Sequence, residues 1–382
     1  MEIIASLGTF LAIVLAALLI AWGAECGQFY VSQGLALAVL AWVQTLPEFS
    51  VEAVIALTAA HDPSKTHLVT ANFTGSLRLF VGLGWPMVYF VAVFFGKKRG
   101  AQKGLWAIQL EDEQAIAVMT LLPALAYFVW IYCKGTLNVF DSGVLAAIYF
   151  FYLYLLSKTP PEEREEMEDL SVVPRAVMRL PKNSSIAVIF ILFISGGLLL
   201  WFMAHPFLDS MLALAVSLGV SEFVFVQWLA PFLSEFPEQL SAFRWARSGK
   251  KAPMALANFV SSSINQWTIL VATVPIIYSI GLGRIGFIAF DEYQKVEILL
   301  TIVQSYLGFL FLVSMDFAFK EALGLFVLWM AQFLVPSIRE EIIWVYGGWA
   351  VVETARIWIH FKERNAFHVF RMLMKEHFPK RV

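Results

Sequence analysis

Long apolar stretches separated by short polar segments run along the whole chain. A helix needs roughly 20 mostly apolar residues to cross the hydrocarbon core of a bilayer. The pattern therefore predicts an all-α polytopic membrane protein with eleven membrane-spanning helices. The predicted spans are residues 3–22, 28–60, 66–95, 114–133, 138–157, 185–204, 209–245, 253–281, 296–314, 317–335 and 341–360.

Four of these spans are too long for one straight crossing, and their interiors contain helix-breaking residues. Irregular backbone survives in a membrane only where it lines a cavity enclosed by protein or water. We therefore expect broken helices in these spans. The spans are 28–60, 66–95, 209–245 and 253–281, with Pro47, Gly75, Pro231, Pro237 and runs of serine inside them.

The composition of the 382-residue chain excludes a water-soluble globule. Only 15% of its residues are charged and 59% are hydrophobic, whereas a soluble domain has about 25% charged residues. The net charge of −2 gives no field that attracts nucleic acid. Two cysteines are too few for a cysteine-built metal site. The sequence has no His-Glu-x-x-His motif and no Gly-rich phosphate loop. We therefore expect neither an enzyme nor an ATP-driven pump, and no cofactor besides a transported cation.

The basic residues predict the orientation of the chain. With the N-terminus outside, the inner loops and the tail hold 19 basic residues, and the outer loops hold five. Cytoplasmic loops of membrane proteins carry such an excess. The sequence therefore predicts a multi-pass protein of the cell membrane, with the N-terminus outside and the C-terminus inside.

Two similar units follow each other along the chain. Ala-Asn-Phe-Thr-Gly-Ser at 71–76 reappears as Ala-Asn-Phe-Val-Ser-Ser at 257–262, and two further matches occur in the same order, at offsets of 179 to 187 residues. Each unit has five predicted helices, so the second enters the membrane from the opposite side. In inverted repeats of this kind the binding site lies near the membrane midplane. We divide the chain into a first repeat (1–157), a polar inner linker (158–184), a second repeat (185–335), and an extra helix with a C-terminal tail (336–382).

These motifs resemble the alpha-repeats of the cation/calcium antiporter superfamily, which includes sodium/calcium and calcium/proton exchangers. The first repeat has Leu-Pro-Glu ending at Glu48 and Asn-Phe-Thr-Gly-Ser at 72–76. The second has Glu235, Pro-Glu ending at Glu238, and Asn-Phe-Val-Ser-Ser at 258–262. The resemblance implies that the repeat glutamates are the central cation ligands, assisted by Ser, Thr and Asn side chains. Leu77 stands where the family has asparagine, and Arg78 follows it, so the resemblance does not extend to the identity of the ion.

The acidic residues support such a site independently of the resemblance. A carboxylate inside a spanning helix is costly and usually marks an ion pathway or a site. Carboxylate, amide and hydroxyl oxygens form the ligand set that hard cations such as Ca²⁺, Mg²⁺ or Na⁺ prefer. The candidate ligands are Glu48, Glu52, Glu235, Glu238, Thr45, Asn72, Ser76, Asn258, Ser262 and Asn265.

Several assignments remain open at the level of sequence. Either Glu235 or Glu238 is the counterpart of Glu48, with spacing in favour of Glu235. Glu52 and Glu238 are ligands, or they pair with Arg78 or lie at a helix end. Arg78 pairs with Glu48 or Glu52 and replaces one ion, or it forms a purely structural ion pair.

Glu222 is a proton carrier or a helix-packing residue. The tail after residue 361 forms an amphipathic helix on the inner leaflet or stays unstructured.

The function expected from these residues is secondary cation antiport by alternating access. Calcium or a similar hard cation would exchange for sodium or protons at the repeat glutamates. The expected partners are inorganic cations and the lipid bilayer. The alternatives are a sodium/proton antiporter and a non-transporting membrane scaffold that keeps the fold. The oligomeric state is not predicted.

Overall fold

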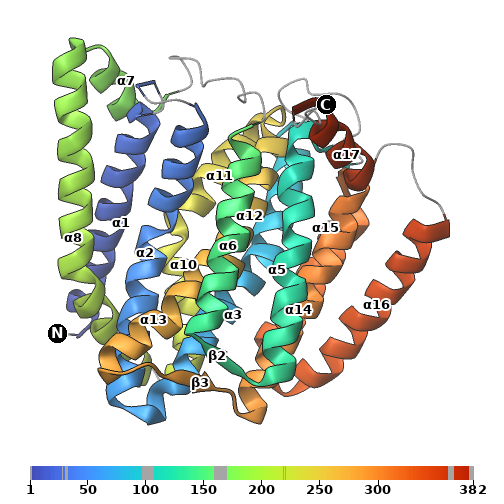
Figure 1. Ribbon diagram of the computed structural model, residues 1–382. Helices are drawn as coiled ribbons and strands as arrows, with labels where there is room; N and C mark the ends of the chain where they lie inside the picture. The colour runs from blue at the N-terminus through green and yellow to red at the C-terminus, as the bar shows by residue number, and fades with distance from the viewer. Residues whose placement is uncertain are drawn as a thin grey trace.

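Figure 1 shows the computed structural model of the protein, a bundle of long helices that run between two opposite faces. The strands β2 and β3 lie at the lower face in this view, and α7 and α17 lie at the upper face. We call these the β2–β3 face and the α17 face. The structure describes residues 2–27, 29–30, 33–96, 107–158, 170–217, 219, 221–359 and 365–377.

Helices dominate both halves of the chain. The first half contains α1 (Glu2–Gly27), α2 (Gln33–His61), η1 (Pro63–Lys65), α3 (Thr66–Leu79), η2 (Phe80–Gly84), α4 (Trp85–Gly96), β1 (Ala107–Gln109), η4 (Asp112–Gln114), α5 (Ala115–Lys134), β2 (Thr136–Asn138) and α6 (Val139–Leu156). The second half begins with α7 (Val172–Met178), α8 (Lys182–Ser217), α9 (Glu222–Val224), η5 (Phe225–Leu229), α10 (Ala230–Ser234), α11 (Phe236–Ser248), α12 (Ala252–Asn265), η6 (Gln266–Leu270) and α13 (Val271–Leu282). It continues with β3 (Phe287–Ala289), α14 (Glu292–Val313), β4 (Asp316–Ala318), α15 (Phe319–Leu334), η7 (Pro336–Ile338), α16 (Arg339–Ile359) and α17 (Ala366–His377).

Within the described residues, helices cover most of each of the eleven predicted spans. Seven helical segments of the described residues are long and apolar enough to cross a membrane. The count is eight if α15 and the bent segment that follows it, which meet at 118°, form one span. The chain is therefore an all-α, multi-pass membrane protein, as the hydrophobic pattern predicts.

The interruptions of the long helices differ in detail from the sequence prediction. α2 runs through Pro47 as one helix from residue 33 to residue 61, so the break predicted there is wrong. No break occurs at Gly75 either, because α3 continues to residue 79 and a single π-helical turn, η2, follows it. Between residues 222 and 248, by contrast, the helix contains the π-helical turn η5 and a break at Glu235. The predicted span 209–245 also begins too early, because α8 extends to residue 217.

The internal repeat is visible in the local structure. The π-helical turns η2 and η6 lie 186 residues apart, the same offset that separates the two Asn-Phe motifs. The starts of α5 and α14 also correspond. Each is preceded by a capping box, formed by Glu111 with Gln114 and by Asp291 with Gln294. These reciprocal bonds satisfy amide groups that a helix start leaves free.

Two pairs of short antiparallel strands join the halves at opposite faces. β1 pairs with β4, with Ile108 opposite Phe317, and β2 pairs with β3, with Leu137 opposite Ile288. All four of these central side chains are buried. Because each pair takes one strand from each half, both faces of the bundle are closed by contacts between the repeats.

Aromatic side chains fill the space between the two repeats. Phe128 on α5 meets Trp267 on η6 edge to face, with ring centroids 4.3 Å apart. Phe80 on η2 lies 5.3 Å from Phe259 on α12 by the same measure. These rings are buried, so apolar contacts join the two repeats inside the bundle.

The tail forms helix α17, so the unstructured alternative is wrong for residues 366–377, but the apolar residues of the helix face the bundle and not an inner leaflet. Its apolar residues Ala366, Val369 and Leu373 are buried in the main core, and Phe367 contacts Phe309 of α14 edge to face. The apolar side of α17 therefore packs against the bundle.

Candidate functional site

Two glutamates, one from each repeat, meet inside the bundle. Glu48 lies in the middle of α2, and Glu235 lies at the break between α10 and α11. Pro237, next but one after Glu235, cannot donate a backbone hydrogen bond, and this favours a new helix start there. Both carboxylates have an exposed fraction of 3%. We call them the central glutamate pair.

Ser76 on α3 and Gln266 on η6 bridge the central glutamate pair. The Ser76 hydroxyl lies 2.7 Å from Glu48 Oε1 and also within hydrogen-bonding distance of Glu235 Oε1. The Gln266 amide donates to Glu48 Oε2 at 2.9 Å and to Glu235 Oε1 at 3.0 Å. Each repeat therefore supplies one acid and one neutral polar group to the same cluster.

The other two predicted glutamates lie beside this pair, in equivalent surroundings. Asn72 Nδ2 donates to Glu52 Oε2 at 2.5 Å, and Asn258 Nδ2 donates to Glu238 Oε1 at 3.0 Å. Ser262 also donates to Glu238. Glu52 is fully buried and Glu238 is 5% exposed, so neither ends a helix in water.

The contacts relate the two repeats in part. Glu52 with Asn72 and Glu238 with Asn258 share the offset of 186 residues. Ser262, at the same offset from Ser76, contacts Glu238, whereas Ser76 contacts both Glu48 and Glu235. The asparagine contacts relate Glu238 to Glu52 and the serine contacts relate it to Glu48, so Glu235 as the counterpart of Glu48 stays a prediction.

Unpartnered oxygens are concentrated in this region. Buried polar groups normally have hydrogen-bond partners. Four side-chain oxygens here have none among the described residues: Glu52 Oε1, Asn72 Oδ1, Glu235 Oε2 and Gln266 Oε1. An arrangement of oxygens without donors is suited to binding a cation.

Three further candidates are Asn265, Thr45 and Glu222. Asn265 is buried next to Gln266 in the chain, whereas the side chains of Thr45 and Glu222 lie outside the part that the structure describes. Within the described ranges, no three or more Asp, Glu, His or Cys side chains form a group that could hold a metal ion.

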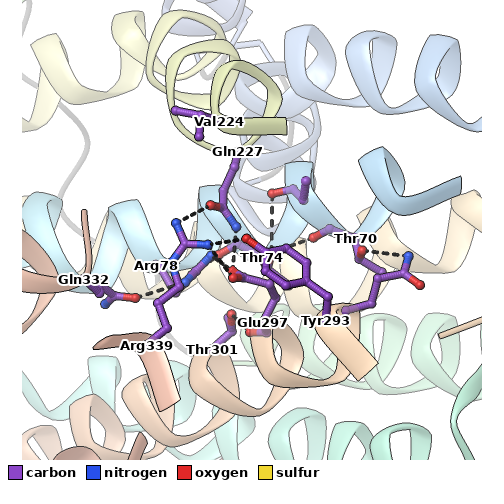
Figure 2. Close-up of polar contacts among 12 residues, drawn as sticks. Thr70, Thr74, Arg78, Val224, Gln227, Tyr293, Glu297, Thr301, Gln332 and Arg339 are labelled. Atoms are coloured by element: carbon purple, nitrogen blue, oxygen red, sulfur yellow. Dashed lines mark hydrogen bonds and ion pairs between the residues drawn. The ribbon is translucent and has the colours of Figure 1, made fainter. Parts of the chain in front are cut away.

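A second buried polar cluster, shown in Figure 2, surrounds Arg78. Arg78 forms an ion pair with Glu297 of α14, and Arg339 at the start of α16 reaches the other oxygen of Glu297 at 2.5 Å. Gln227 of η5 connects Glu297 with Arg339, because it donates to Glu297 at 2.5 Å and accepts from Arg339 at 2.9 Å. We call Arg78, Glu297, Arg339 and Gln227 the arginine cluster.

Of the two alternatives for Arg78, the pairing with Glu48 or Glu52 is wrong, because its ion pair is with Glu297. Its three guanidinium nitrogens are directed to Glu297, to Gln332 at 3.0 Å and to the carbonyl oxygen of Thr74 at 3.1 Å. The guanidinium also lies over the ring of Trp228, 4.9 Å from its centroid. Arg78 is thus held by α14, α15 and η5, and it is not a direct partner of the glutamates in the site.

Sequence reasoning missed Gln266, Glu297 and Arg339. Glu297 lies two residues after Lys295 at the start of a predicted span, and Arg339 lies three residues after Pro336 in a short segment between two spans. Both therefore resemble residues at a membrane surface, yet they are 1% and 3% exposed. Gln266 gives a clearer signal, because it is a polar residue in the middle of an apolar span.

The comparisons with known proteins agree with the fold and the repeats. The family "Sodium/calcium exchanger protein" matches residues 3–158 and 188–337. A crystal structure of the H⁺/Ca²⁺ exchanger CAX matches with a TM-score of 0.89 and 30% identity, over 98% of this chain and 91% of that chain. A structure of the sodium-calcium exchanger NCX_Mj, soaked with 100 mM Na⁺ and 10 mM Sr²⁺, shares the fold at a TM-score of 0.57 and 19% identity, over 88% of this chain and 99% of that chain.

No curated protein sequence matches the chain. The family match nevertheless covers both repeats and most of the chain. The protein therefore belongs to the sodium/calcium exchanger family of cation antiporters.

Proposed function

We propose that this antiporter exchanges Ca²⁺ for protons by alternating access, with Glu48 and Glu235 as the central ligands. The observation that carries the proposal is the meeting of these two buried acids, one from each repeat, at a single serine hydroxyl. Inverted repeats place a shared site at their interface. The same site is then reached from either face as the repeats move.

The ligand set supports a hard divalent cation. Ca²⁺ takes six to eight oxygen ligands from carboxylates, amides, backbone carbonyls and water. Two carboxylates of the central pair match its charge, and Ser76 and Gln266 add neutral oxygens. The similarity to an H⁺/Ca²⁺ exchanger points to the same ion.

Hydrogen counting supports protons as the counter-ion. A serine hydroxyl has one hydrogen to donate, but the oxygen of Ser76 lies within hydrogen-bonding distance of both Glu48 and Glu235. Protonation of one of the two glutamates would let that acid donate to Ser76 while the hydroxyl donates to the other. Two buried acids that share one hydroxyl in this way are suited to holding a proton when no metal is bound and to exchanging it for a cation.

The distribution of basic residues supports the orientation and the location. We place the protein in the cell membrane, with the N-terminus outside and the α17 face inside, because basic residues are concentrated in the predicted inner loops. We keep the repeat boundaries at 1–157 and 185–335, with 158–184 as the linker and 336–382 as an addition.

Ion flux into proteoliposomes tests the proposal. Ca²⁺ uptake is measured first under an imposed pH gradient and then under an imposed Na⁺ gradient. The Glu48→Gln and Glu235→Gln variants are compared with Glu292→Gln, the same change at a 90% exposed side chain. We expect uptake with the pH gradient, its loss in both central variants, and full uptake in the control.

The alternative outcomes separate the other functions. Uptake driven only by Na⁺ contradicts the proton assignment. Sodium/proton exchange without Ca²⁺ movement contradicts the calcium assignment. A chain that moves no cation under any gradient is a scaffold with the exchanger fold.

A further inference from the structure

The arginine cluster carries a net positive charge inside the protein. Two guanidinium groups, Arg78 and Arg339, share the single carboxylate of Glu297. The side chains of all three are at most 4% exposed. Burial removes the water that would screen this charge, so its field extends further than that of a surface group.

The neighbours of the cluster do not neutralise it. The side chains that its hydrogen bonds reach, Gln227, Gln332 and Tyr293, are uncharged in their ordinary forms. Glu340 and Glu341, which follow Arg339, are exposed to the surroundings of the bundle. The net charge of the cluster therefore remains one positive unit.

The positive charge lies close to the central glutamate pair. Arg78 follows Ser76 by two residues on α3, so its guanidinium is on the order of 10 Å from the oxygens that Ser76 contacts. η5 joins the two regions as well. A Cβ atom added to Gly75 would lie 1.6 Å from the carbonyl oxygen of Gln227, so the backbones of α3 and η5 touch beside Ser76.

Helix α16 supplies the second guanidinium group, which gives the cluster its net positive charge. Arg78 alone would form a neutral pair with Glu297. Arg339 is the first residue of α16, which lies outside both repeats and beyond residue 337, where the family match ends. Its guanidinium changes a neutral pair into a cluster with one net charge.

We propose that the Arg78–Glu297–Arg339 cluster is a built-in positive charge that weakens cation binding at the central glutamate pair, and that α16 provides it through Arg339. The proposal rests on the proposed function. A fixed charge repels the bound ion in proportion to the charge of that ion, so a divalent cation is affected twice as strongly as a monovalent one. The cluster thus keeps Ca²⁺ affinity low enough for release and sets the balance between Ca²⁺ and protons.

The test measures Ca²⁺ binding to the purified full-length protein by isothermal titration calorimetry at fixed pH. Arg339→Gln removes the extra charge and leaves Glu297 paired with Arg78. We expect the dissociation constant for Ca²⁺ to fall by roughly a few hundredfold, as Coulomb's law gives for a unit charge acting on a divalent ion at about 10 Å and an effective dielectric constant of about 20. Arg78→Gln leaves the cluster with the same net charge as Arg339→Gln, because Glu297 is then paired with Arg339 alone. We expect the dissociation constant for Ca²⁺ to fall in this variant as well.

Arg339→Lys is the matched control, because it keeps the charge and alters the hydrogen bonds. We expect its Ca²⁺ affinity to stay within about threefold of the wild type. A merely structural role predicts the opposite order, with weaker binding in Arg339→Gln and no rescue by lysine. If Arg78→Gln does not fold, the comparison of Arg339→Gln with Arg339→Lys decides alone.

The outcomes distinguish this inference from the function on which it rests. Ca²⁺ binding to the wild type with equal or weaker binding in Arg339→Gln overturns the inference and leaves the proposed function standing. A wild-type protein that binds no Ca²⁺ contradicts the proposed function and the inference with it. Tighter binding in both glutamine variants, with a wild-type affinity in the lysine variant, supports the fixed charge.

Discussion

The two buried polar clusters are built on opposite principles. The central glutamate pair joins two acids without a basic partner, and oxygens in and around it lack hydrogen-bond donors. The arginine cluster pairs its only acid with two guanidinium groups, and neutral amides complete most of its hydrogen bonds. A site that exchanges its occupant must leave ligands free, whereas a cluster that holds helices together must satisfy them.

The positions of the clusters agree with these roles. The central pair combines α2 with the break between α10 and α11, so it stands where the two repeats meet. The arginine cluster connects α3, η5, α14, α15 and α16, as Figure 2 shows for its labelled side chains. Removing an acid of the central pair should therefore affect transport most, and removing the shared acid of the arginine cluster should affect stability most.

Glu297→Gln should have the largest effect on stability. Removing one partner of a buried charge pair leaves uncompensated charge and costs about 3–5 kcal/mol. Here the loss leaves two guanidinium groups without a carboxylate. Thermal unfolding in detergent, followed by tryptophan fluorescence, measures the change. A melting temperature equal to that of the wild type would show that the arginine cluster does not hold the helices together.

Glu48→Gln should abolish transport but not stability. Ca²⁺ uptake should fall by roughly a hundredfold or more, because the site loses one of its two carboxylates and affinity depends on their number. The melting temperature should stay the same or rise, since burying a neutral amide costs less than burying an acid that must ionise. Flux assays and thermal unfolding on the same preparation separate the two effects. A large drop in melting temperature would mean that this acid holds the fold.

Gly75→Ala should have an intermediate effect. The new Cβ would lie 1.6 Å from the carbonyl oxygen of Gln227, so α3 and η5 must move apart. Overpacking of this kind typically costs about 1–3 kcal/mol. Gly143→Ala on α6 is the matched control, because no atom lies within 4 Å of its added Cβ. The control should be unchanged or more stable, since alanine favours a helix. Equal melting temperatures for the two variants would contradict the close contact of α3 with η5.

Glu292→Gln should have the smallest effect. Its ion pair with Lys295 has a length of 2.8 Å, but the Glu292 side chain is 90% exposed. Exposed ion pairs contribute about 0–1 kcal/mol. Transport and melting temperature should both match the wild type. A clear loss of either property would indicate a role for this surface pair that the buried clusters do not explain.

The sequence predicts the parts of the fold that depend on local pattern. Apolar stretches locate the helices, and the repeated Asn-Phe motifs reveal the inverted repeat, because both signals are contiguous in the chain. Glu48 and Glu235 stand out because acids are costly inside apolar spans. Their meeting follows from the symmetry of the repeats.

The partners of single side chains are not predictable in the same way. Glu297 lies 219 residues from Arg78, and Arg339 lies 42 residues beyond Glu297. Each of these two lies near the end of an apolar stretch, so only the packing of α14 and α16 shows that it is buried. The break predicted at Pro47 fails for a related reason. Neighbouring helices compensate for a proline inside a membrane helix, and the sequence does not show which neighbours are present.

The strand pairs β1–β4 and β2–β3 have a consequence for the order of synthesis. β1 and β2 are made with the first half of the chain, but their partners are made only after more than 140 further residues. Until then both strands present unpaired backbone groups, which attract other chains. The first half thus has one strand without its partner at each of the two faces until the second half is made. Arrival of β3 and then β4 completes one face after the other, so β2–β3 pairing precedes β1–β4 pairing as the chain is made.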